Sequence, residues 1–481
     1  MTVWNYILLI LTSLYFLMVA ASVYTVLFER RDPTRAFMWI VVIVVVPVAG
    51  LLSFMVFGQN YRKRKMFRHK EGELLRRKEL LSEWQFDNLD TINFHQVTDH
   101  INIVKLLLKN SKAPITVNNH ISILKNGEKT FPSLFAALRS AKHHIHLEYY
   151  KVADDTLGNE LSDILCAKAQ EGVKVRLLFD DVGSWSLPRR YQKKLKSAGV
   201  EVKSFLPAIF PFITSSVNYR NHRKITVVDG KVGFMGGLNI ADKYLNGLSF
   251  GIWRDTHIRI EGEAVRILQA TFLNDWYLAT KKEVTLSRAY FPIITKQHTA
   301  TPCQIAVSGP DSDYAAIMQC FFAAISRAKN YVYISTPYFL PSETLLSALK
   351  VAALSGVDVR IILPEKSDTK IVHWASRSYF TEMMEAGIKI YLYNKGFNHS
   401  KIMIIDGTFC SVGSANMDMR SFEDNFEITA MIYDKTLTSE MESDFTEDLS
   451  DSTHITLEGW NNRKKKDNVK EAAARLFAPL L

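Results

Sequence analysis

The sequence predicts an α/β protein in which two related lobes follow an N-terminal membrane segment. A ten-residue string at 221–230 recurs in modified form at 398–407. Helical and strand-like segments alternate in the same order around both copies, which is typical of a duplicated α/β unit. Two long apolar runs lie ahead of both copies, near the N-terminus. These three observations together predict the fold class.

The two apolar runs cover about 6–28 and 36–57, and neither contains a charged residue. At about 1.5 Å per residue, each is long enough to cross a hydrocarbon core of about 30 Å as a helix. We therefore expect a two-helix transmembrane hairpin over 1–60, with a kink at Pro47 in its second helix. A cleaved signal peptide is disfavoured, because residues 1–5 carry no positive side chain.

The net charge of +10 is concentrated in a few segments. Residues 62–79 contribute +6 and residues 463–475 contribute +4, so the rest of the chain is close to neutral. A nucleic-acid-binding protein carries basic charge on its working face, so this distribution argues against nucleic acid and favours anionic membrane lipid. Solvated charge without a specific partner is the alternative. A basic run after membrane helices also predicts a multi-pass protein of the cell membrane with its lobes in the cytoplasm.

Residues 61–110 are predicted to form a basic, helical connector between the membrane segment and the lobes. After it, 121–130 alternates between apolar and polar residues around Asn126-Gly127, a pattern that predicts a β-hairpin turn. The cysteines lie too far apart for a CxxC pair, and we expect reduced core thiols without a disulfide or a zinc site. They are Cys166, Cys303, Cys320 and Cys410.

From residue 131 onward, helices alternate with short apolar strands, and the whole alternation occurs twice. The predicted elements are a helix at 131–142, a strand at 144–149 and a helix at 157–170 in the first copy, and a helix at 318–329, a strand at 331–335 and a helix at 342–354 in the second. The offset between the copies drifts slowly, as small insertions and deletions would produce. We therefore expect two α/β lobes, at 111–300 and 301–481.

Each copy of the repeated string carries the same polar residues at the same spacing. A lysine follows each histidine by two residues, an aspartate by seven and an asparagine by 17. One copy alone is best explained as a structural strand, but two copies in register favour a shared functional site. The residues are His222, Lys224, Asp229 and Asn239 in the first copy, and His399, Lys401, Asp406 and Asn416 in the second.

These residue types suit reaction at a phosphodiester. The apolar runs 225–228 and 402–405 predict short buried strands, on which residues two apart point to the same face. A neutral imidazole is a competent nucleophile or general base near neutral pH. Lysine presents positive charge to phosphate oxygens, and asparagine can donate amide hydrogens to them. With two histidines, one can attack phosphorus while the other transfers protons, so no metal or other cofactor is required.

Four carboxylates near the motifs have less certain roles. Asp229 and Asp406 each precede a glycine, so they either shape a turn or take part in catalysis. Asp255 and Glu427 follow the asparagine of their own copy, and both are candidates to orient the two imidazoles. The apolar segment 205–213, just ahead of the first motif, is either a buried loop or a loop that contacts lipid.

The paired motifs resemble the phospholipase D superfamily, and other segments resemble its bacterial cardiolipin synthases. Those segments are 30–34, 253–257, 335–341 and 475–481. The resemblance covers essentially the whole chain and implies phospholipase D-like lobes packed as a pseudo-twofold sandwich, with the active site at the dyad. It also implies a reaction in which two phosphatidylglycerol molecules give cardiolipin and glycerol.

In that resemblance, His222 attacks phosphorus to form a phosphatidyl-histidine, and His399 serves as acid and then base. The residues that would hold the phosphate are Lys224, Lys401, Asn239 and Asn416. Two alternatives are open, a hydrolytic phospholipase D and a membrane-tethered nuclease. The order of the two histidines, the acceptor, the acyl-chain preference and the oligomeric state are also open.

Overall fold

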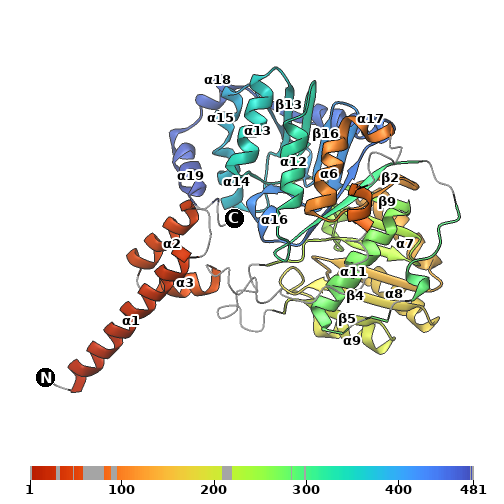
Figure 1. Ribbon diagram of the computed structural model, residues 1–481, viewed down its shortest axis with the longest axis horizontal. Coiled ribbons are helices and arrows are strands. Elements are labelled where there is room, and N and C mark those ends of the chain that lie inside the picture. Colours follow the sequence, from red (N-terminus) through yellow and green to blue (C-terminus); the bar gives the residue numbers. More distant parts are fainter. Residues whose placement is uncertain are drawn as a thin grey trace. The chain divides into compact units, whose positions relative to one another are not determined.

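The computed structural model describes residues 3–28, 33–46, 48–57, 81–87, 95–207, 219–282, 284–285, 287–296, 300–476 and 478. They fall into two compact units (Figure 1). The first contains the N-terminal helices. The second is a large α/β unit that holds both histidine motifs. The basic run 62–79 lies outside the described residues.

Among the described residues, the N-terminal unit contains the helices α1 (Val3–Phe28), α2 (Pro33–Val45) and α3 (Ala49–Phe57). In this part of the described chain, one helix is long and apolar enough to cross a membrane, over Val3–Tyr24. The predicted two-helix hairpin is not confirmed, because the second apolar run is divided into α2 and α3. Pro47 stands between them in the sequence, and a proline cannot continue a helical hydrogen-bond ladder.

Two β-sheets form the frame of the large unit (Figure 1). The first contains, in spatial order, β2 (Asn119–Lys125), β9 (Thr256–Gly262), β7 (Val232–Gly236), β6 (Ile225–Val228), β3 (His144–Tyr149), β4 (Lys174–Asp180) and β5 (Glu201–Phe205). The second contains β1 (Ile115–Thr116), β10 (Cys303–Ser308), β19 (Glu427–Ile432), β17 (Phe409–Gly413), β16 (Ile402–Ile405), β11 (Tyr331–Ser335), β13 (Asp358–Pro364), β14 (Lys389–Tyr393) and β20 (Ser452–Ile455). Two small pairings join β12 (Phe339–Leu340) to β18 (Met417–Asp418) and β8 (Ile252–Arg254) to β15 (Gly396–Asn398).

The two sheets are copies of one design. The order β2-β9-β7-β6-β3-β4-β5 corresponds strand for strand to β10-β19-β17-β16-β11-β13-β14, and β1 and β20 are extra edge strands of the second sheet. In both copies the first four pairings are antiparallel and the last two are parallel. This shared order and direction confirms the predicted duplication. The four predicted strands, β3, β6, β11 and β16, have the expected bounds.

Helices connect the strands and cover the sheets. They are α6 (Ile101–Asn110), α7 (Asn126–Ser140), α8 (Thr156–Gln170), α9 (Arg189–Ser197), α10 (Lys243–Asn246), α11 (Ala264–Thr280), α12 (Ala316–Ile325), α13 (Glu343–Leu354), α14 (Lys370–Arg377), α15 (Phe380–Glu385), α16 (Met419–Glu423), α17 (Lys435–Ser450), α18 (Leu457–Asn461) and α19 (Lys465–Arg475). Short 3-10 turns lie at His95–His100 and Arg288–Tyr290.

Alternate residues of the motif strands supply different hydrophobic cores. On β6, Ile225 and Val227 join a core to which both sheets, α11 and α17 contribute, and the equivalent residues of β16 do the same. Val228 instead packs in the core under α7 and α8. Burial of one such side chain stabilises the fold by about 1.5–3 kcal/mol, so the shared core holds the two lobes together. Three cysteines are buried as predicted, whereas Cys166 is only partly buried.

The hairpin turn predicted at Asn126-Gly127 is wrong, because β2 ends at Lys125 and α7 begins at Asn126. The backbone N–H of Asn126 donates to the carbonyl of Asp255 at 2.9 Å, and its side-chain oxygen accepts from the N–H of Asp255 at 3.1 Å. A Cβ on Gly127 would lie 2.4 Å from the carbonyl oxygen of Tyr244. Asn126-Gly127 therefore allows this part of the chain to lie close to the segments of Tyr244 and Asp255. The sequence pattern is the same as that of a hairpin turn, so it does not distinguish the two.

The predicted connector also differs from the structure at its C-terminal end. Helix α6 buries Ile103, Val104, Leu107 and Leu108 in the core under α12 and α13, and β1 pairs with β10. Residues 101–116 therefore belong with the second sheet rather than with a connector or the first lobe. The amphipathic pattern predicted a covered face, but the sequence does not say which core covers it.

Candidate active site

Two short pairings between the lobes bring the histidine motifs together. Strand β8 of the first lobe runs parallel to β15 of the second, and Asn221 forms a parallel bridge with Phe426. The backbone N–H of His399 donates to the carbonyl of Arg254 at 2.7 Å, and that of His222 donates to the carbonyl of Phe426 at 3.0 Å. Each of these carbonyl groups belongs to the residue immediately before a buried carboxylate. Each histidine is thereby placed against a carboxylate of the opposite lobe.

The resulting carboxylate–histidine pairs are crossed between the lobes. Nδ1 of His399 lies 2.7 Å from Oδ2 of Asp255. Nδ1 of His222 lies 3.0 and 3.1 Å from the two carboxylate oxygens of Glu427. Both carboxylates thus lie beside an imidazole, and each belongs to the lobe opposite that of its histidine. The interlobe backbone pairing decides the partner, and spacing along the chain carries no information about it.

The His222 imidazole has a defined tautomer. Its Nδ1 lies 3.1 Å from the carbonyl oxygen of Ser414 as well as beside Glu427. A carbonyl oxygen only accepts hydrogen bonds, so Nδ1 carries the hydrogen and the lone pair of the neutral ring lies on Nε2. The ring of Tyr150 packs edge-on against this imidazole, with 5.1 Å between centroids.

The surroundings of the His399 imidazole are different. Its Nδ1 faces Asp255 and also lies 3.1 Å from the ammonium of Lys401. Trp253 packs against the ring at 4.8 Å and donates its indole N–H to Oδ2 of Asp255 at 3.3 Å. Tyr338 lies farther out, with 6.5 Å between ring centroids. One Nδ1 atom therefore meets both a hydrogen-bond acceptor and a donor.

The motif lysines fold back onto their own histidines. Nζ of Lys224 donates to the carbonyl of His222 at 2.5 Å, and Nζ of Lys401 donates to that of His399 at 2.6 Å. Burial lowers the pKa of Lys224 to about 7, although Glu427 opposes the effect. Burial likewise lowers the pKa of Lys401 to about 8, although Asp255 opposes it. The two ammonium groups repel each other, so an anion bound between them would restore their pKa values.

The histidine and carboxylate pairs differ in charge balance. Burial lowers the pKa of both imidazoles, and at His399 the nearby lysines lower it further, well below the ordinary value. Burial raises the pKa of Asp255, and Lys401 only partly offsets this. At Glu427, burial is outweighed by the charges of His222 and Lys224, and the carboxyl pKa is lowered. An anionic phosphodiester in the site would raise the pKa of each imidazole.

The asparagines are committed to local contacts. The side-chain oxygen of Asn239 accepts from the N–H of Lys151 at 3.1 Å, and its amide donates to the hydroxyl of Tyr244 at 3.0 Å. Asn416 is buried, and its side chain hydrogen-bonds Asp418. Contact of either asparagine with phosphate therefore stays a prediction.

Asp229 and Asp406 lie beyond the far ends of β6 and β16, away from the histidines. The carboxylate of Asp229 accepts from three successive backbone N–H groups, those of residues 142–144, each at 2.8 Å. Asp406 accepts from residues 329–331 at 2.7–2.9 Å in the same pattern. Both have a positive φ, 53° and 50°, as a turn before glycine requires. This geometry favours the turn-supporting role over the catalytic one.

The spacing of the motifs did not identify two residues that lie beside the carboxylates of the site. Gly237 and Ser414 occupy equivalent positions in the two copies. A Cβ on Gly237 would lie 2.0 Å from a carboxylate oxygen of Asp255, whereas the Ser414 hydroxyl donates to Glu427. The Gly-Gly and Gly-Ser difference is visible in the sequence, but its meaning depends on which carboxylate lies beside it.

The family of the chain follows from comparison with known proteins. A family model described as "Cardiolipin synthase, PLD-like domain" matches residues 134–276 and 321–449, which include both motifs. The chain belongs to this cardiolipin synthase family. A second model, "Phospholipase D-nuclease N-terminal", matches residues 16–59.

Relatives in the cardiolipin synthase family are similar over nearly their whole length. The chain is 44% identical to a cardiolipin synthase of Geobacillus sp. strain WCH70, over 94% of this chain and 90% of that protein. It is 39% identical to a cardiolipin synthase of Oceanobacillus iheyensis, over 98% and 99% of the respective chains. The solved structure of a phosphatidylserine synthase of Haemophilus influenzae has the same fold, with a TM-score of 0.61, 16% identity, and coverage of 79% of this chain and 100% of that one.

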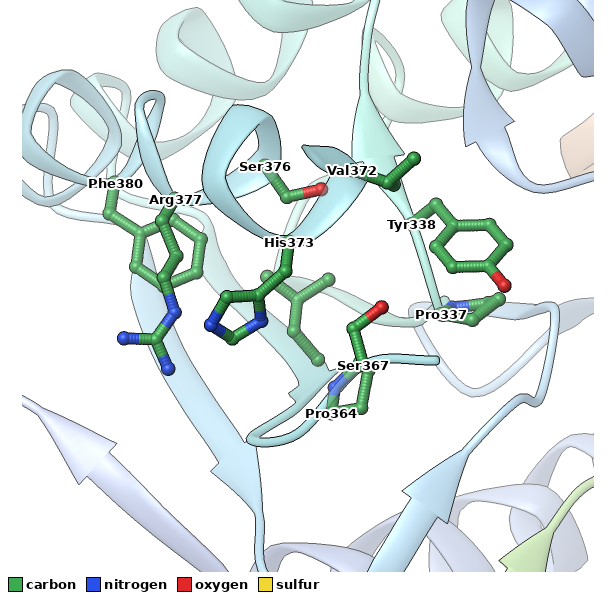
Figure 2. Close-up of a pocket in the computed structure, with 10 residues that line it drawn as sticks. Pro337, Tyr338, Pro364, Ser367, Val372, His373, Ser376, Arg377 and Phe380 are labelled. Atoms are coloured by element: carbon green, nitrogen blue, oxygen red, sulfur yellow. The ribbon is translucent and has the colours of Figure 1, made fainter. Parts of the chain in front are cut away.

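In this member of the cardiolipin synthase family, a cavity adjoins the His399 side of the site. Its lining residues are Pro337, Tyr338, Leu363, Pro364, Ser367, Val372, His373, Ser376, Arg377 and Phe380. Tyr338 and Pro337 lie at one end, and Arg377 and Phe380 at the other (Figure 2). Tyr338 contacts His399 and also donates its hydroxyl to Asp368 at 2.7 Å, so this tyrosine links the cavity to the site.

Two further expectations concern this site. Most of the apolar segment 205–213 lies outside the described residues, which end at Pro207 and resume at Tyr219. Within the described part of the chain, no three His, Cys, Asp or Glu residues are grouped so as to hold a metal ion. The positive charge of the candidate site comes from its lysines.

Proposed function

We propose that this protein is a cardiolipin synthase that transfers a phosphatidyl group from one phosphatidylglycerol to a hydroxyl of another. The products are cardiolipin and glycerol. The observation that carries the proposal is the crossed arrangement, in which each buried imidazole is held by a carboxylate of the other lobe beside a buried lysine. Relatives of the same length carry the name cardiolipin synthase, which supports the same reaction here.

In the first step, Nε2 of His222 attacks the phosphorus of the donor lipid. The N–P bond forms as the bond from phosphorus to the glycerol oxygen breaks, and His399 gives a proton to that oxygen. The hydrogen held on Nδ1 of His222 by Ser414 and Glu427 supports this role, because it leaves the lone pair on Nε2. The anionic substrate and Asp255 favour the protonated form of His399 that the step needs.

In the second step, a glycerol hydroxyl of the acceptor lipid attacks the phosphatidyl-histidine. The new O–P bond forms as the N–P bond breaks, and the hydroxyl proton passes to His399, which restores both histidines. Lys224 and Lys401 neutralise the charge that develops on the phosphoryl oxygens. Acid–base assistance of this kind accelerates a step by about 10²–10⁴-fold.

The N-terminal helices attach the enzyme to the cell membrane, with its catalytic lobes in the cytoplasm. The apolar helix over Val3–Tyr24 and the basic run 62–79 support this orientation. In a multi-pass arrangement, residues 29–32 lie outside the cytoplasm. A cysteine placed among them should then react with an impermeant maleimide in intact cells, and a cysteine at exposed Lys196 should not. The reverse labelling pattern contradicts this topology.

The reaction is tested with the full-length protein in vesicles of phosphatidylglycerol. We expect cardiolipin and glycerol in equal amounts from the wild type, and a loss of both with Lys401→Ala. Phosphatidic acid and glycerol without cardiolipin would identify a hydrolytic phospholipase D instead. Cleavage of nucleic acid without lipid turnover would identify a nuclease.

The order of the two histidines is tested with a phosphatidyl p-nitrophenol donor, whose leaving group departs without a proton. His399→Ala should still release a burst of nitrophenolate and retain the phosphatidyl group on the protein after quenching at alkaline pH. His222→Ala should show neither. A burst in the His222→Ala protein with none in the His399→Ala protein would reverse the assignment.

A further inference from the structure

Two lysines outside the motifs lie beside the candidate active site without carboxylate partners. Among the described residues, no carboxylate comes within 4.0 Å of the ammonium of Lys151 or Lys243. Both side chains are partly exposed, so each can meet a ligand. Paired lysines elsewhere in the molecule, such as Lys125 with Asp444 and Glu447, show the contrast.

The ammonium of Lys243 lies over two aromatic rings beside the candidate active site. Its ammonium lies 4.5 Å from the ring of Trp253 and 5.0 Å from that of Tyr244. The ring of Trp253 lies 4.8 Å from the imidazole of His399. The Lys243–Trp253 and Trp253–His399 distances, added together, therefore set an upper limit on the distance from the Lys243 ammonium to the His399 imidazole. Desolvation also lowers the pKa of Lys243, and the positive charge of Lys151 lowers it further.

Lys151 belongs to a segment that packs beside His222, and its charge acts on Lys243. It follows Tyr150, whose ring packs on His222, and its backbone N–H is held by the side chain of Asn239. Asn239 in turn donates to Tyr244, the residue after Lys243. The motif asparagine thus ties the two lysine-bearing segments together. The negative charge of Asp368, which is exposed and accepts from Tyr338, acts in the opposite direction and raises the pKa of Lys243.

The proposed reaction needs positive charge at a second place. The lysines of the motifs serve the phosphate that is transferred. The acceptor phosphatidylglycerol carries its own phosphodiester, one glycerol away from the attacking hydroxyl, and this group is not transferred. When that hydroxyl reaches His399, the second phosphate lies in the neighbourhood of the imidazole. An unpaired ammonium there favours an anionic acceptor over water or a neutral alcohol.

We propose that Lys243, together with Lys151, forms a second phosphate subsite that binds the phosphodiester of the acceptor lipid beside His399. The subsite rests on the proposed function, because it explains which acceptor that same reaction selects. It accounts for selection of a lipid acceptor without any contact to the transferred group. It also assigns Asn239 to the placement of the subsite, because that side chain joins the segments that carry the lysines.

The test compares two reactions of the full-length enzyme in phosphatidylglycerol vesicles. One is cardiolipin formation, which needs the anionic acceptor. The other is incorporation of labelled glycerol into phosphatidylglycerol, in which a neutral alcohol takes the phosphatidyl group from His222. For Lys243→Gln and for Lys151→Gln, we expect cardiolipin formation to fall about 10- to 100-fold relative to glycerol incorporation. Lys243→Arg should keep most of the wild-type ratio.

Lys196→Gln, at an exposed position of α9, is the matched control for the loss of one positive charge, and its ratio should stay at the wild-type value. Equal loss of both reactions in the Lys243 and Lys151 variants, or no loss in either, would overturn the subsite. Thermal unfolding of each variant identifies loss of fold, in which case the ratio for Lys243→Arg decides. If the wild type makes no cardiolipin but still incorporates glycerol, the proposed function fails and the subsite fails with it, whereas a wild type that makes cardiolipin beside variants with an unchanged ratio overturns the subsite alone.

Discussion

The two halves of the candidate site have the same backbone design but different hydrogen bonding around the imidazole. His222 is held by both oxygens of Glu427 and by the Ser414 carbonyl. His399 is held by one oxygen of Asp255 and lies next to the ammonium of Lys401. The first arrangement retains one tautomer, whereas the second meets both a donor and an acceptor. The duplicated site therefore suits one fixed imidazole and one that gains and loses a proton.

The two carboxylates also differ, because their pKa values are shifted in opposite directions. Glu427 has a lowered pKa because His222 and Lys224 outweigh its burial, so it remains an anion. Burial raises the pKa of Asp255, which makes its negative charge more costly to keep. A fixed anion would stabilise the positive charge that His222 acquires in the proposed attack on phosphorus. The comparison therefore supports the proposal that the nucleophile belongs to the His222 half and proton transfer to the His399 half.

Removing the charge of each carboxylate should have the largest effect and should separate the halves. With the nitrophenyl donor, Glu427→Gln should slow the burst roughly 10²-fold, because the positive charge on His222 loses its partner. Asp255→Asn should leave the burst within a few-fold of wild type but slow cardiolipin formation roughly 10²-fold. If both variants slow the burst equally, the two halves do not differ in role.

Exchange of the small residues beside the carboxylates should have a smaller and unequal effect. Gly237→Ala has no space for its Cβ beside Asp255, so this carboxylate must move away from His399. We expect cardiolipin formation to fall about 10- to 100-fold, since a displaced acid–base group loses part of its contribution. Ser414→Gly removes the hydrogen bond to Glu427 and the one accepted from the backbone N–H of Ile428, and it should lower cardiolipin formation about tenfold or less. A larger loss from Ser414→Gly would contradict this ranking.

The pH dependence of kcat/KM for the nitrophenyl donor reports the free enzyme. Activity should fall on the acid side below pH 6.5, because burial lowers the pKa of His222 and the nucleophile must be neutral. It should fall again above about pH 7 to 8, as Lys224 and Lys401 lose their protons. Lys224→Arg should move the alkaline limb upward, toward the pKa of Lys401, because a guanidinium stays charged. An unchanged alkaline limb in this variant would exclude Lys224 as its cause.

Asp229 and Asp406 should affect stability far more than chemistry. Asp229→Ala removes a carboxylate that accepts three backbone N–H groups and leaves alanine at a positive φ. We expect the free energy of unfolding to fall by about 2–4 kcal/mol, measured by denaturant titration. Asp406→Ala should behave alike, since the contacts are equivalent. A folded variant whose kcat falls 100-fold would instead support a catalytic role.

Much of the fold was predictable from local patterns. The strands at 144–149, 225–228, 331–335 and 402–405 have the expected bounds, since short apolar runs between turn residues suit buried strands. One expectation failed because a local pattern has two physical causes: Asn126-Gly127 permits a close approach as well as a hairpin turn. The apolar run after residue 36 is long enough to span a membrane, and its division into α2 and α3 leaves the predicted second span unconfirmed.

The sequence by itself determined that two equivalent histidine motifs lie on buried strands of duplicated lobes, because residue spacing is retained along a chain. It also determined how charge is distributed along the chain and which residues are candidates for the active site. Only the tertiary structure decided that Glu427 meets His222 and Asp255 meets His399. Those partners are chosen by backbone hydrogen bonds between β8 and β15 and between Asn221 and Phe426. The position of Lys243 across Trp253 from His399 was likewise set by packing between distant segments, which no spacing rule encodes.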